Sequence, residues 1–415
     1  MLDFLQVFGH DRDDDVVIIP DSEGTVFQLR PDILLERFWE SVRVGQQRAR
    51  LGMKEADANV TYQKMVFGAS KTCGVDVDEP ACYAAPHSLL KTNVYGRQTD
   101  RLAIKEEDPN VFMRERFIDT GFVMGELKAV KNLYERALQI MEADKEKRTE
   151  QDAIARIFGE QEYYRASLRE KNSTDWERKR HSVARFFGIG EANPLAPHPT
   201  HRKVELQADT QYEWAIGLDY EGLLTAASSS PKIMGFANHN ETSMLYNLRS
   251  QHGVSTSVGT SLQEDIHRSF PPFWSRTPLW DQPRWPKLSW SDIPLFTNLW
   301  TGAIPASFHL NPSTVSLNQT WFHPYMRLKL DDYVSLPDRQ FATLRGAGKE
   351  VAYWGLWREK WALRRSKKFR EGEVREKDDD WVQWKDVCGN YMEEILSDGQ
   401  GGWDTTVHDW GRGDN

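Results

Sequence analysis

The sequence contains no apolar run that approaches the roughly 20 residues needed for a transmembrane helix. Its first residues, Met1 to Leu5, also lack the basic and apolar regions of a secretory signal peptide. We therefore expect no membrane segment in the chain as written, and a cytosolic location if it is expressed in this form.

The chain has no excess of positive charge, since 53 Lys and Arg residues stand against 62 Asp and Glu residues and the formal net charge is -9 at pH 7. A general nucleic-acid-binding protein normally carries a basic surface, so we expect no nucleic-acid partner. With 415 residues, 39% of them hydrophobic and 28% charged, the chain is long enough to bury a full core in one large domain or two smaller ones.

Cysteine is rare as well, and three cysteines are too few for a disulfide scaffold. Cys73 and Cys82 lie nine residues apart in a polar stretch, where they can form one bridge or remain free cytosolic thiols. Four Asn-x-Thr/Ser triplets fit the glycosylation pattern, which requires a lumenal location, although chance also produces such triplets. They begin at Asn59, Asn172, Asn240 and Asn318.

The first half of the chain alternates apolar strand patterns with helical patterns. After residue 126 the apolar residues recur every three or four positions, as on one buried helix face. Strands are expected at 16–19, 64–69, 117–124 and 214–218, and helices at 2–7, 32–43, 127–141 and from residue 150. This alternation predicts an α/β fold with a mixed, mainly parallel sheet that is flanked by helices on both sides.

The second half is different in composition. Residues 171–212 form a polar, Pro-containing insertion, and residues 213–325 are rich in Trp and Pro with little helical periodicity, which predicts a loop-dominated region. The aromatic residues between 270 and 290 suit either a wall of a sugar site or a loop surface fixed by buried rings. A charged helical extension is expected over 331–415, with a helix at 349–370 and a disordered tail from about 397.

The run from Asp15 to Leu29 is an apolar strand with acidic side chains at its end. In α/β folds, ligands bind at the carboxyl ends of strands, and Mg²⁺ or Mn²⁺ takes one or two carboxylates together with nucleotide phosphates. Asp21 and Glu23 carry carboxylates and lie at the end of such a strand, so they are candidate ligands for the metal. The alternative is an ordinary polar turn, since Asp, Ser and Gly are common turn residues.

This segment, with Phe27-Gln28-Leu29 just after it, resembles the metal-site strand of a fungal glycosyltransferase-like family related to the glycosyltransferase domain of procollagen lysyl hydroxylases. Further blocks match in the same order over about residues 1–325. They are Val66-Phe67-Gly68-Ala69 with Cys73 and Cys82-Tyr83, Arg116 to Gly125, Ile157 to Tyr163, Gly217 to Glu221, and Ile293 to Asn298 leading to His309-Leu310-Asn311. The resemblance implies a glycosyltransferase domain of the GT-A type over residues 1–330.

The resemblance also implies a role for particular residues. Asp21 corresponds to the first metal-binding carboxylate, with Glu23 as a possible substitute for the second, and His309 corresponds to the distant third ligand of Mn²⁺ or Mg²⁺. Imidazole ligation favours manganese. Outside such a family, a lone His is usually a satisfied core or surface residue. The sugar nucleotide, a UDP-sugar, is expected to contact Asp21, Thr120, Gly121, His309 and Asn311.

Two pairs of acidic residues are candidates for catalytic work. Glu150 and Asp152 occupy the place of an acidic-Gln block in the family, near the sugar, although carboxylates at a helix start also serve as simple caps. Asp219 and Glu221 follow the strand at 214–218 and are candidates for the acceptor side. No general base is nominated, because the related domain retains configuration in its glucosyl transfer.

The chain departs from the family pattern at the site itself. Gly24 stands where the second carboxylate of an Asp-x-x-Asp motif belongs, Asp119-Thr120-Gly121 replaces Asn-Ser-Gly, and Gly74 replaces a Trp. Fifteen residues before Val16 leave room for one short helix and no nucleotide-binding strand. We therefore expect a domain that lacks its first N-terminal strand, with reduced stability.

The expected function is transfer of a sugar from a UDP-sugar to a hydroxyl acceptor with a divalent metal, in the lumen of the Golgi or endoplasmic reticulum for the full-length family. Two alternatives stand beside it. The chain can be a catalytically inactive relative that acts as a glycan- or protein-binding module, because the metal motif is incomplete. It can also be a structural protein that binds a partner through its Trp-rich half.

Overall fold

A computed structural model describes most of the first 309 residues and four later strands. The described residues are 5–6, 12–20, 25–106, 108–143, 149–174, 193–196, 198–227, 233–254, 261–269, 289–292, 295–309, 341–346, 349–354, 373–375 and 381–383. Contacts divide the chain into two compact units, one of residues 1–235, 246–259 and 296–311, and the other of residues 236–245, 260–295 and 312–415.

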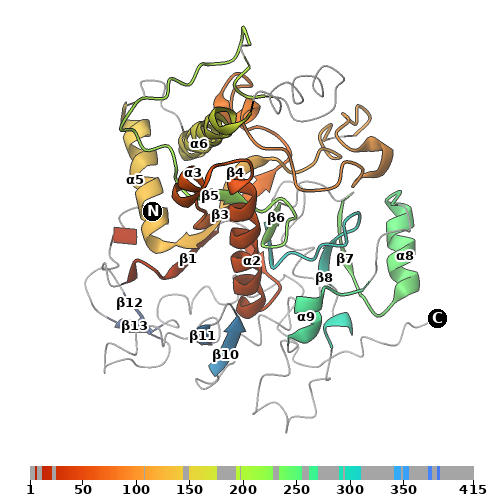
Figure 1. Ribbon diagram of the computed structural model, residues 1–415. Coiled ribbons are helices and arrows are strands. Elements are labelled where there is room, and N and C mark those ends of the chain that lie inside the picture. The colour runs from red at the N-terminus through yellow and green to blue at the C-terminus, as the bar shows by residue number, and fades with distance from the viewer. Residues whose placement is uncertain are drawn as a thin grey trace, which may run out of the picture. The chain divides into compact units, whose positions relative to one another are not determined.

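The first unit is built on a four-stranded sheet with the strand order β1-β4-β3-β5 (Figure 1). The strands are β1 (Val16–Pro20), β3 (Met65–Ser70), β4 (Phe117–Glu126) and β5 (Ile216–Leu218). All four lie at the segments that the apolar patterns predict. β4 runs antiparallel to both β1 and β3, and β3 runs parallel to β5.

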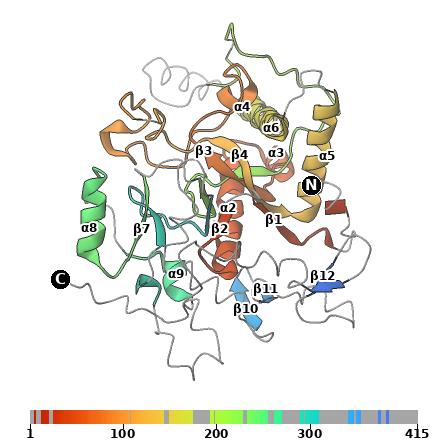
Figure 2. The same cartoon turned by 180° about the vertical axis from the view of Figure 1, so that it is seen from behind.

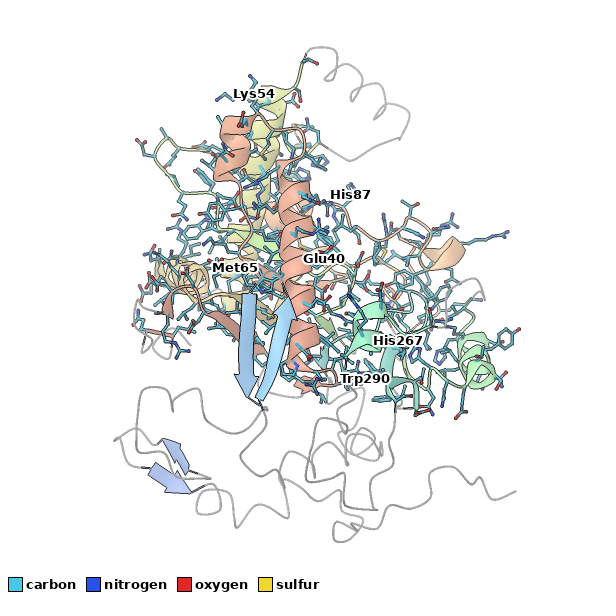
Figure 3. The ribbon with its side chains drawn as sticks, turned by 60° about the horizontal axis from the view of Figure 1, so that its bottom comes forward. Glu40, Lys54, Met65, His87, His267 and Trp290 are labelled. Atoms are coloured by element: carbon cyan, nitrogen blue, oxygen red, sulfur yellow. A yellow bond between two sulfur atoms is a disulfide. The ribbon has the colours of Figure 1, made fainter. Side chains whose placement is uncertain are left out.

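Three long helices flank this sheet, and Figure 2 shows them from behind. They are α2 (Pro31–Arg50), α5 (Leu127–Ala143) and α6 (Glu150–Asn172). α5 and α6 contact each other and β4, whereas α2 contacts β3 and β5. Met65, labelled in Figure 3, and Phe67 belong to the apolar core with α5 and α6. The helices predicted from residues 32, 127 and 150 are therefore confirmed.

The prediction of a mixed sheet flanked by helices is confirmed, but the expectation that the sheet is mainly parallel is wrong. Among the described strand pairs with a defined register, five are antiparallel and two are parallel. β1 and β3 do run in the same direction, as expected for two strands joined by α2, but β4 lies between them and pairs with both. A continuous apolar run specifies a buried strand without specifying its neighbour, so the pattern predicted the strands correctly and their pairing incorrectly.

A second, three-stranded sheet joins segments that are far apart in the sequence. It consists of β2 (Thr25–Phe27), β9 (Ser307–His309) and β6 (Thr225–Ala227), in the order β2-β9-β6. β9 is antiparallel to β2 and parallel to β6. The sheet positions the end of the strand that carries His309.

The remaining described elements are short. They are α3 (Glu55–Val60), α4 (Pro80–Tyr83), η2 (Gly96–Gln98), β7 (Met234–Ala237), α8 (Thr242–Gln251), α9 (Glu264–Arg268), η4 (Trp290–Asp292) and β8 (Leu295–Asn298). β7 and β8 form a two-stranded sheet. Among the described helices, none is both long and apolar enough to span a bilayer.

Cys73 and Cys82 form a disulfide with a Cα–Cα distance of 5.6 Å, so the bridged alternative is confirmed for this pair. The bridge closes the loop that leaves β3 and returns at α4. Part of the polar segment at 171–212 packs against the same loop, because the Arg202 backbone amide donates to the Asp78 carbonyl at 2.9 Å. An Arg202–Glu79 ion pair at 2.6 Å reinforces that contact.

The helix predicted at 349–370 is wrong at its start. Residues Lys349–Trp354 form β11, which pairs antiparallel with β10 (Phe341–Gly346), and β12 (Glu373–Arg375) pairs with β13 (Trp381–Gln383). The register places Phe341 opposite Trp354, and aromatic and β-branched residues are common in strands. The tail from about 397 and the aromatic stretch at 270–288 lie outside the described residues.

Candidate functional site

The carboxyl ends of β3 and β5 meet at one edge of the main sheet, because these two strands are parallel. Lys71 directly follows β3, and Glu221 lies three residues after β5. β4 runs the other way, so its beginning lies at the same edge, two residues after Glu115. The topology thus gathers one basic and two acidic side chains from three segments.

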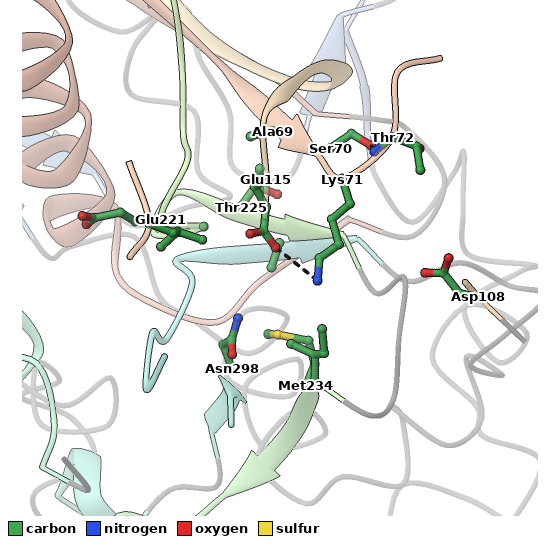
Figure 4. A pocket seen from close by; sticks show the side chains of 14 residues that line it. Ala69, Ser70, Lys71, Thr72, Asp108, Glu115, Glu221, Thr225, Met234 and Asn298 are labelled. Atoms are coloured by element: carbon green, nitrogen blue, oxygen red, sulfur yellow. Dashed lines mark hydrogen bonds and ion pairs between the residues drawn. The ribbon is translucent and has the colours of Figure 1, made fainter. Parts of the chain in front are cut away.

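These side chains line a cavity of about 150 Å³ (Figure 4). Its polar lining also includes Asp108, Thr225 and Asn298, and Leu90, Ile233 and Met234 give it an apolar part. All of these residues belong to the first unit. The cavity combines several hydrogen-bonding groups with a few apolar contacts, which is the usual character of a small-molecule site.

Lys71 is the main positive charge of the cavity and is held by three groups. Its Nζ donates to the Val111 carbonyl at 2.6 Å, lies 3.6 Å from the Glu115 carboxylate, and stands 4.3 Å from the centre of the Tyr95 ring. Burial lowers the pKa of Lys71, and Glu115 acts in the opposite direction. The Tyr95 hydroxyl donates to both Glu115 oxygens at 3.0 Å, so the carboxylate is fixed between phenol and ammonium.

Asp219 organises the turn that leads from β5 into β6. Its Oδ1 accepts the Leu223 amide at 3.0 Å, and its Oδ2 accepts the amides of Leu224 and Thr225 at 2.7 and 3.0 Å. Burial raises the pKa of Asp219 to about 6, and the three amides oppose this shift. In this geometry, Asp219 positions Glu221 and Thr225 at the cavity and holds the start of β6.

Gly68 connects this edge with the block Asp119-Thr120-Gly121. The register of β3 against β4 shifts between Phe67 and Gly68. A Cβ atom at Gly68 would lie 3.4 Å from both the Asp119 carbonyl oxygen and the Thr225 methyl group, so β3 approaches both residues closely here. The predicted nucleotide-binding block therefore lies beside the strand that lines the cavity.

The same block is tied to the start of α6. The Thr120 amide and hydroxyl donate to the Gln151 side-chain oxygen at 2.9 and 2.6 Å, and the Gln151 amide group donates to the Ile118 carbonyl at 3.0 Å. The sequence blocks around Thr120 and around Glu150 to Asp152 are therefore neighbours in the folded chain. The local sequence pattern of neither block could predict that the two blocks lie side by side.

At the beginning of α6, Asp152 acts as a helix cap, which was the alternative to a catalytic role. Its carboxylate accepts the Thr149 amide at 2.9 Å, and the Thr149 hydroxyl accepts the Asp152 amide at 3.2 Å, which is a capping box. Glu150 is exposed on the first turn. The pKa of Tyr134 is raised mainly by the burial of its own side chain and secondly by the charge of Glu150. The catalytic roles of Glu150 and Asp152 remain predictions.

His309 ends β9 and is half-buried. Its Cα partner in β2 is Thr25, and its partner in β6 is Ala227. The other two predicted metal ligands, Asp21 and Glu23, and the predicted nucleotide contact Asn311 lie outside the described residues. Within the part of the chain that the structure describes, no group of three or more His, Cys, Asp or Glu side chains is arranged to hold a metal.

Buried polar side chains hold the three-stranded sheet together. Gln28 donates to the carbonyls of Phe296 and Pro305 at 2.9 and 2.7 Å and accepts the Phe296 amide at 2.8 Å. Arg37 donates to the carbonyls of Leu223 and Ile304 at 2.8 and 2.5 Å. These contacts bind the segments before β6 and β9 to α2 and the end of β2.

The sequence interpretation missed several of these residues. Lys71 was detectable, because it follows a predicted strand directly, and ligands bind at the carboxyl ends of strands. Glu115 and Tyr95 lie in loops without a local signal, and the importance of Gln28 and Arg37 depends on partners more than 180 residues away. No protein-family model matches the chain, and comparison with curated proteins finds no significant match.

Proposed function

We propose that this chain transfers a sugar from a UDP-sugar to a hydroxyl-bearing acceptor with a divalent metal, as a transferase of the GT-A type. The observation that carries the proposal is the register of β2 against β9. It makes His309 the partner of Thr25, which follows Glu23 by two residues and Asp21 by four in the sequence. The register thus places His309 opposite the first described residue that follows Asp21 and Glu23 in the sequence, which supports the proposal.

The donor set fits manganese. One imidazole and one or two carboxylates are ligands that Mn²⁺ accepts readily, whereas an all-oxygen set would favour Mg²⁺. In the proposal, His309 with Asp21 and Glu23 would hold the metal, which would supply positive charge to the diphosphate of the donor. Thr120 and Gly121, beside the cavity strand at Gly68, would contact the nucleotide.

The cavity at the edge of β3 and β5 suits a polyhydroxylated ligand. Asp108 supplies a carboxylate acceptor and Asn298 an amide that both donates and accepts, whereas the exposed Glu221 carboxylate points away from Lys71 (Figure 4). The positive charge of Lys71 offsets the negative charge of Glu115. The remaining carboxylates, Asp108 and Glu221, give the cavity lining a net negative charge. In this arrangement Glu221 would contact the acceptor hydroxyl, and Asp219 would position it through the turn.

A lumenal location is part of the proposal, and the Cys73–Cys82 disulfide supports it. Structural disulfides persist in the secretory pathway and are rare in the reducing cytosol. Cys73 of this disulfide directly follows the cavity residues Lys71 and Thr72 in the sequence. An oxidising compartment would therefore also keep the wall of the cavity in place.

Calorimetry of UDP binding with and without Mn²⁺ tests the proposal. We expect binding that requires Mn²⁺, and we expect His309→Ala to weaken it at least tenfold. His267→Ala, which changes an exposed histidine on α9, is the matched control and should bind as the parent does. Absence of UDP binding by the parent chain in Mn²⁺ would remove the transferase proposal and leave a binding module.

A further inference from the structure

Three of the four Asn-x-Thr/Ser triplets lie in described regions, and the environments of their asparagines differ. Asn59 is exposed at the end of α3, Asn172 is half-buried at the end of α6, and Asn240 is exposed before α8. Asn318 lies outside the described residues. The surroundings of each amide nitrogen decide which site tolerates an attached glycan.

Two of the three amides are engaged in the fold. The Asn172 side chain donates to the Asp57 carboxylate at 2.7 Å, which ties the end of α6 to α3. The Asn240 side chain donates to the Asp292 carboxylate at 2.6 Å within the second unit, and Asp292 also accepts bonds from Ser289. A glycan on either nitrogen would replace an amide hydrogen at a contact that the fold uses.

Asn59 differs from both. Within the described part of the chain, its side chain forms no hydrogen bond or ion pair, and the next residue, Val60, is 53% exposed. Lys54, the residue before α3, is labelled in Figure 3. A glycan at Asn59 would therefore extend into solvent without displacing a packed group and would cover an exposed apolar side chain.

The third residue of the triplet determines when modification occurs. Thr61 is only 1% exposed, and its hydroxyl donates to the Asp57 carbonyl at 2.9 Å. The hydroxyl that completes the pattern is thus buried in the folded chain. Modification must take place while the segment is still extended, as it does when a chain enters the lumen of the secretory pathway.

We propose that, in the folded and secreted chain, Asn59 carries an N-linked glycan and Asn172 does not, because a glycan at Asn172 would break the contact with Asp57 that the fold uses. In the transfer step, the Asn59 amide nitrogen forms a bond to the first sugar carbon of a lipid-linked oligosaccharide diphosphate. The bond from that carbon to the diphosphate breaks, the lipid diphosphate leaves, and the nitrogen loses one proton. The proposal depends on a lumenal location and is independent of the sugar-transfer activity of this chain.

The experiment expresses the full chain behind a secretory signal in a eukaryotic host. An amidase that removes N-linked glycans is applied in ¹⁸O-water, which converts each formerly glycosylated Asn into labelled Asp that peptide mass spectrometry detects. We expect label at Asn59 and none at Asn172. Asn59→Gln should lose the corresponding mobility shift, whereas Asn172→Gln and Thr61→Ser, which preserve the first triplet, should keep it.

The disulfide supplies an internal control for the compartment. A secreted chain in which Cys73 and Cys82 are bridged but Asn59 carries no label would overturn the proposal, and so would label at Asn172. Because the Asn59 side chain is exposed and forms no hydrogen bond with the described residues, Asn59→Gln should unfold at the same denaturant midpoint as the deglycosylated parent. A large loss of stability would show that the side chain has a structural role instead.

Discussion

The main sheet and the three-stranded sheet are held together by different kinds of side chain. The strands β1, β3, β4 and β5 pack against an apolar core shared with α5 and α6. The strands β2, β6 and β9 have three residues each, and buried polar groups from Gln28, Arg37 and Asp219 hold them. Apolar burial therefore builds the frame, and polar contacts position the candidate site on it.

This contrast has a physical consequence for the site. A polar group that spans two backbone carbonyls fixes both position and direction, whereas apolar contacts tolerate small shifts. Arg37 joins the segment before β6 to the segment before β9, so the place of His309 relative to Glu221 depends on it. The two sheets should respond differently to substitution.

The largest expected effect is in the apolar frame. Phe158 on α6 is 1% exposed and belongs to the apolar core, and Phe158→Ala removes its ring. We expect the free energy of unfolding to fall by about 3–5 kcal/mol, because the substitution loses buried area and leaves a cavity. Urea denaturation measures this change.

Leu138→Ala is the matched control for Phe158→Ala. Leu138 is 42% exposed on α5, so its substitution should change the free energy of unfolding by much less. Equal losses for the two variants would contradict the assignment of the frame to an apolar core.

The second expected effect is a pH dependence at Asp219. Its pKa rises from 3.8 to about 6 on folding, so the folded state binds the proton more tightly than the unfolded state. This contribution to stability is fully present below pH 4 and is lost as the pH rises through 6, with a total of about 3 kcal/mol. Asp219→Asn does not titrate and should lack this component.

The measurement is the free energy of unfolding of parent and Asp219→Asn at several pH values between 4 and 7. The difference between the two chains should move in favour of the Asp219→Asn variant as the pH rises. A constant offset between them across this range would mean that the three amide bonds to Asp219 fully compensate its burial.

The smallest expected effect is local to the three-stranded sheet. The buried Ser307 hydroxyl donates to the Leu224 carbonyl at 2.9 Å, and that carbonyl also accepts the Ser307 amide. Ser307→Ala should therefore lower the free energy of unfolding by only about 1 kcal/mol. Hydrogen exchange at the backbone amides of β6 should nevertheless become faster.

Ser167→Ala provides the comparison for this variant, because the Ser167 hydroxyl donates to the Tyr164 carbonyl at 2.7 Å within α6. It should leave exchange in β6 unchanged. Faster exchange in β6 for both variants, or for neither, would count against separate control of the two sheets.

The frame was largely predictable from the sequence because its signals are local. Val16 to Ile19 form a continuous apolar run, α5 has one apolar face, and Pro31 with Asp32 marks the start of α2. The pairing order was not predictable, since β4 lies between β1 and β3 and an apolar strand does not specify its neighbours. Strand β11 likewise lies where the start of a helix was predicted.

The sequence by itself determined where most strands and helices of the frame form and placed Cys73 near enough to Cys82 for a bridge, because periodicity and short separation act within a few turns of chain. Only the tertiary structure decided that His309 pairs with Thr25 and that Lys71 meets Glu115. Those contacts close loops of very different length, and buried polar groups whose partners are far away in the sequence select them.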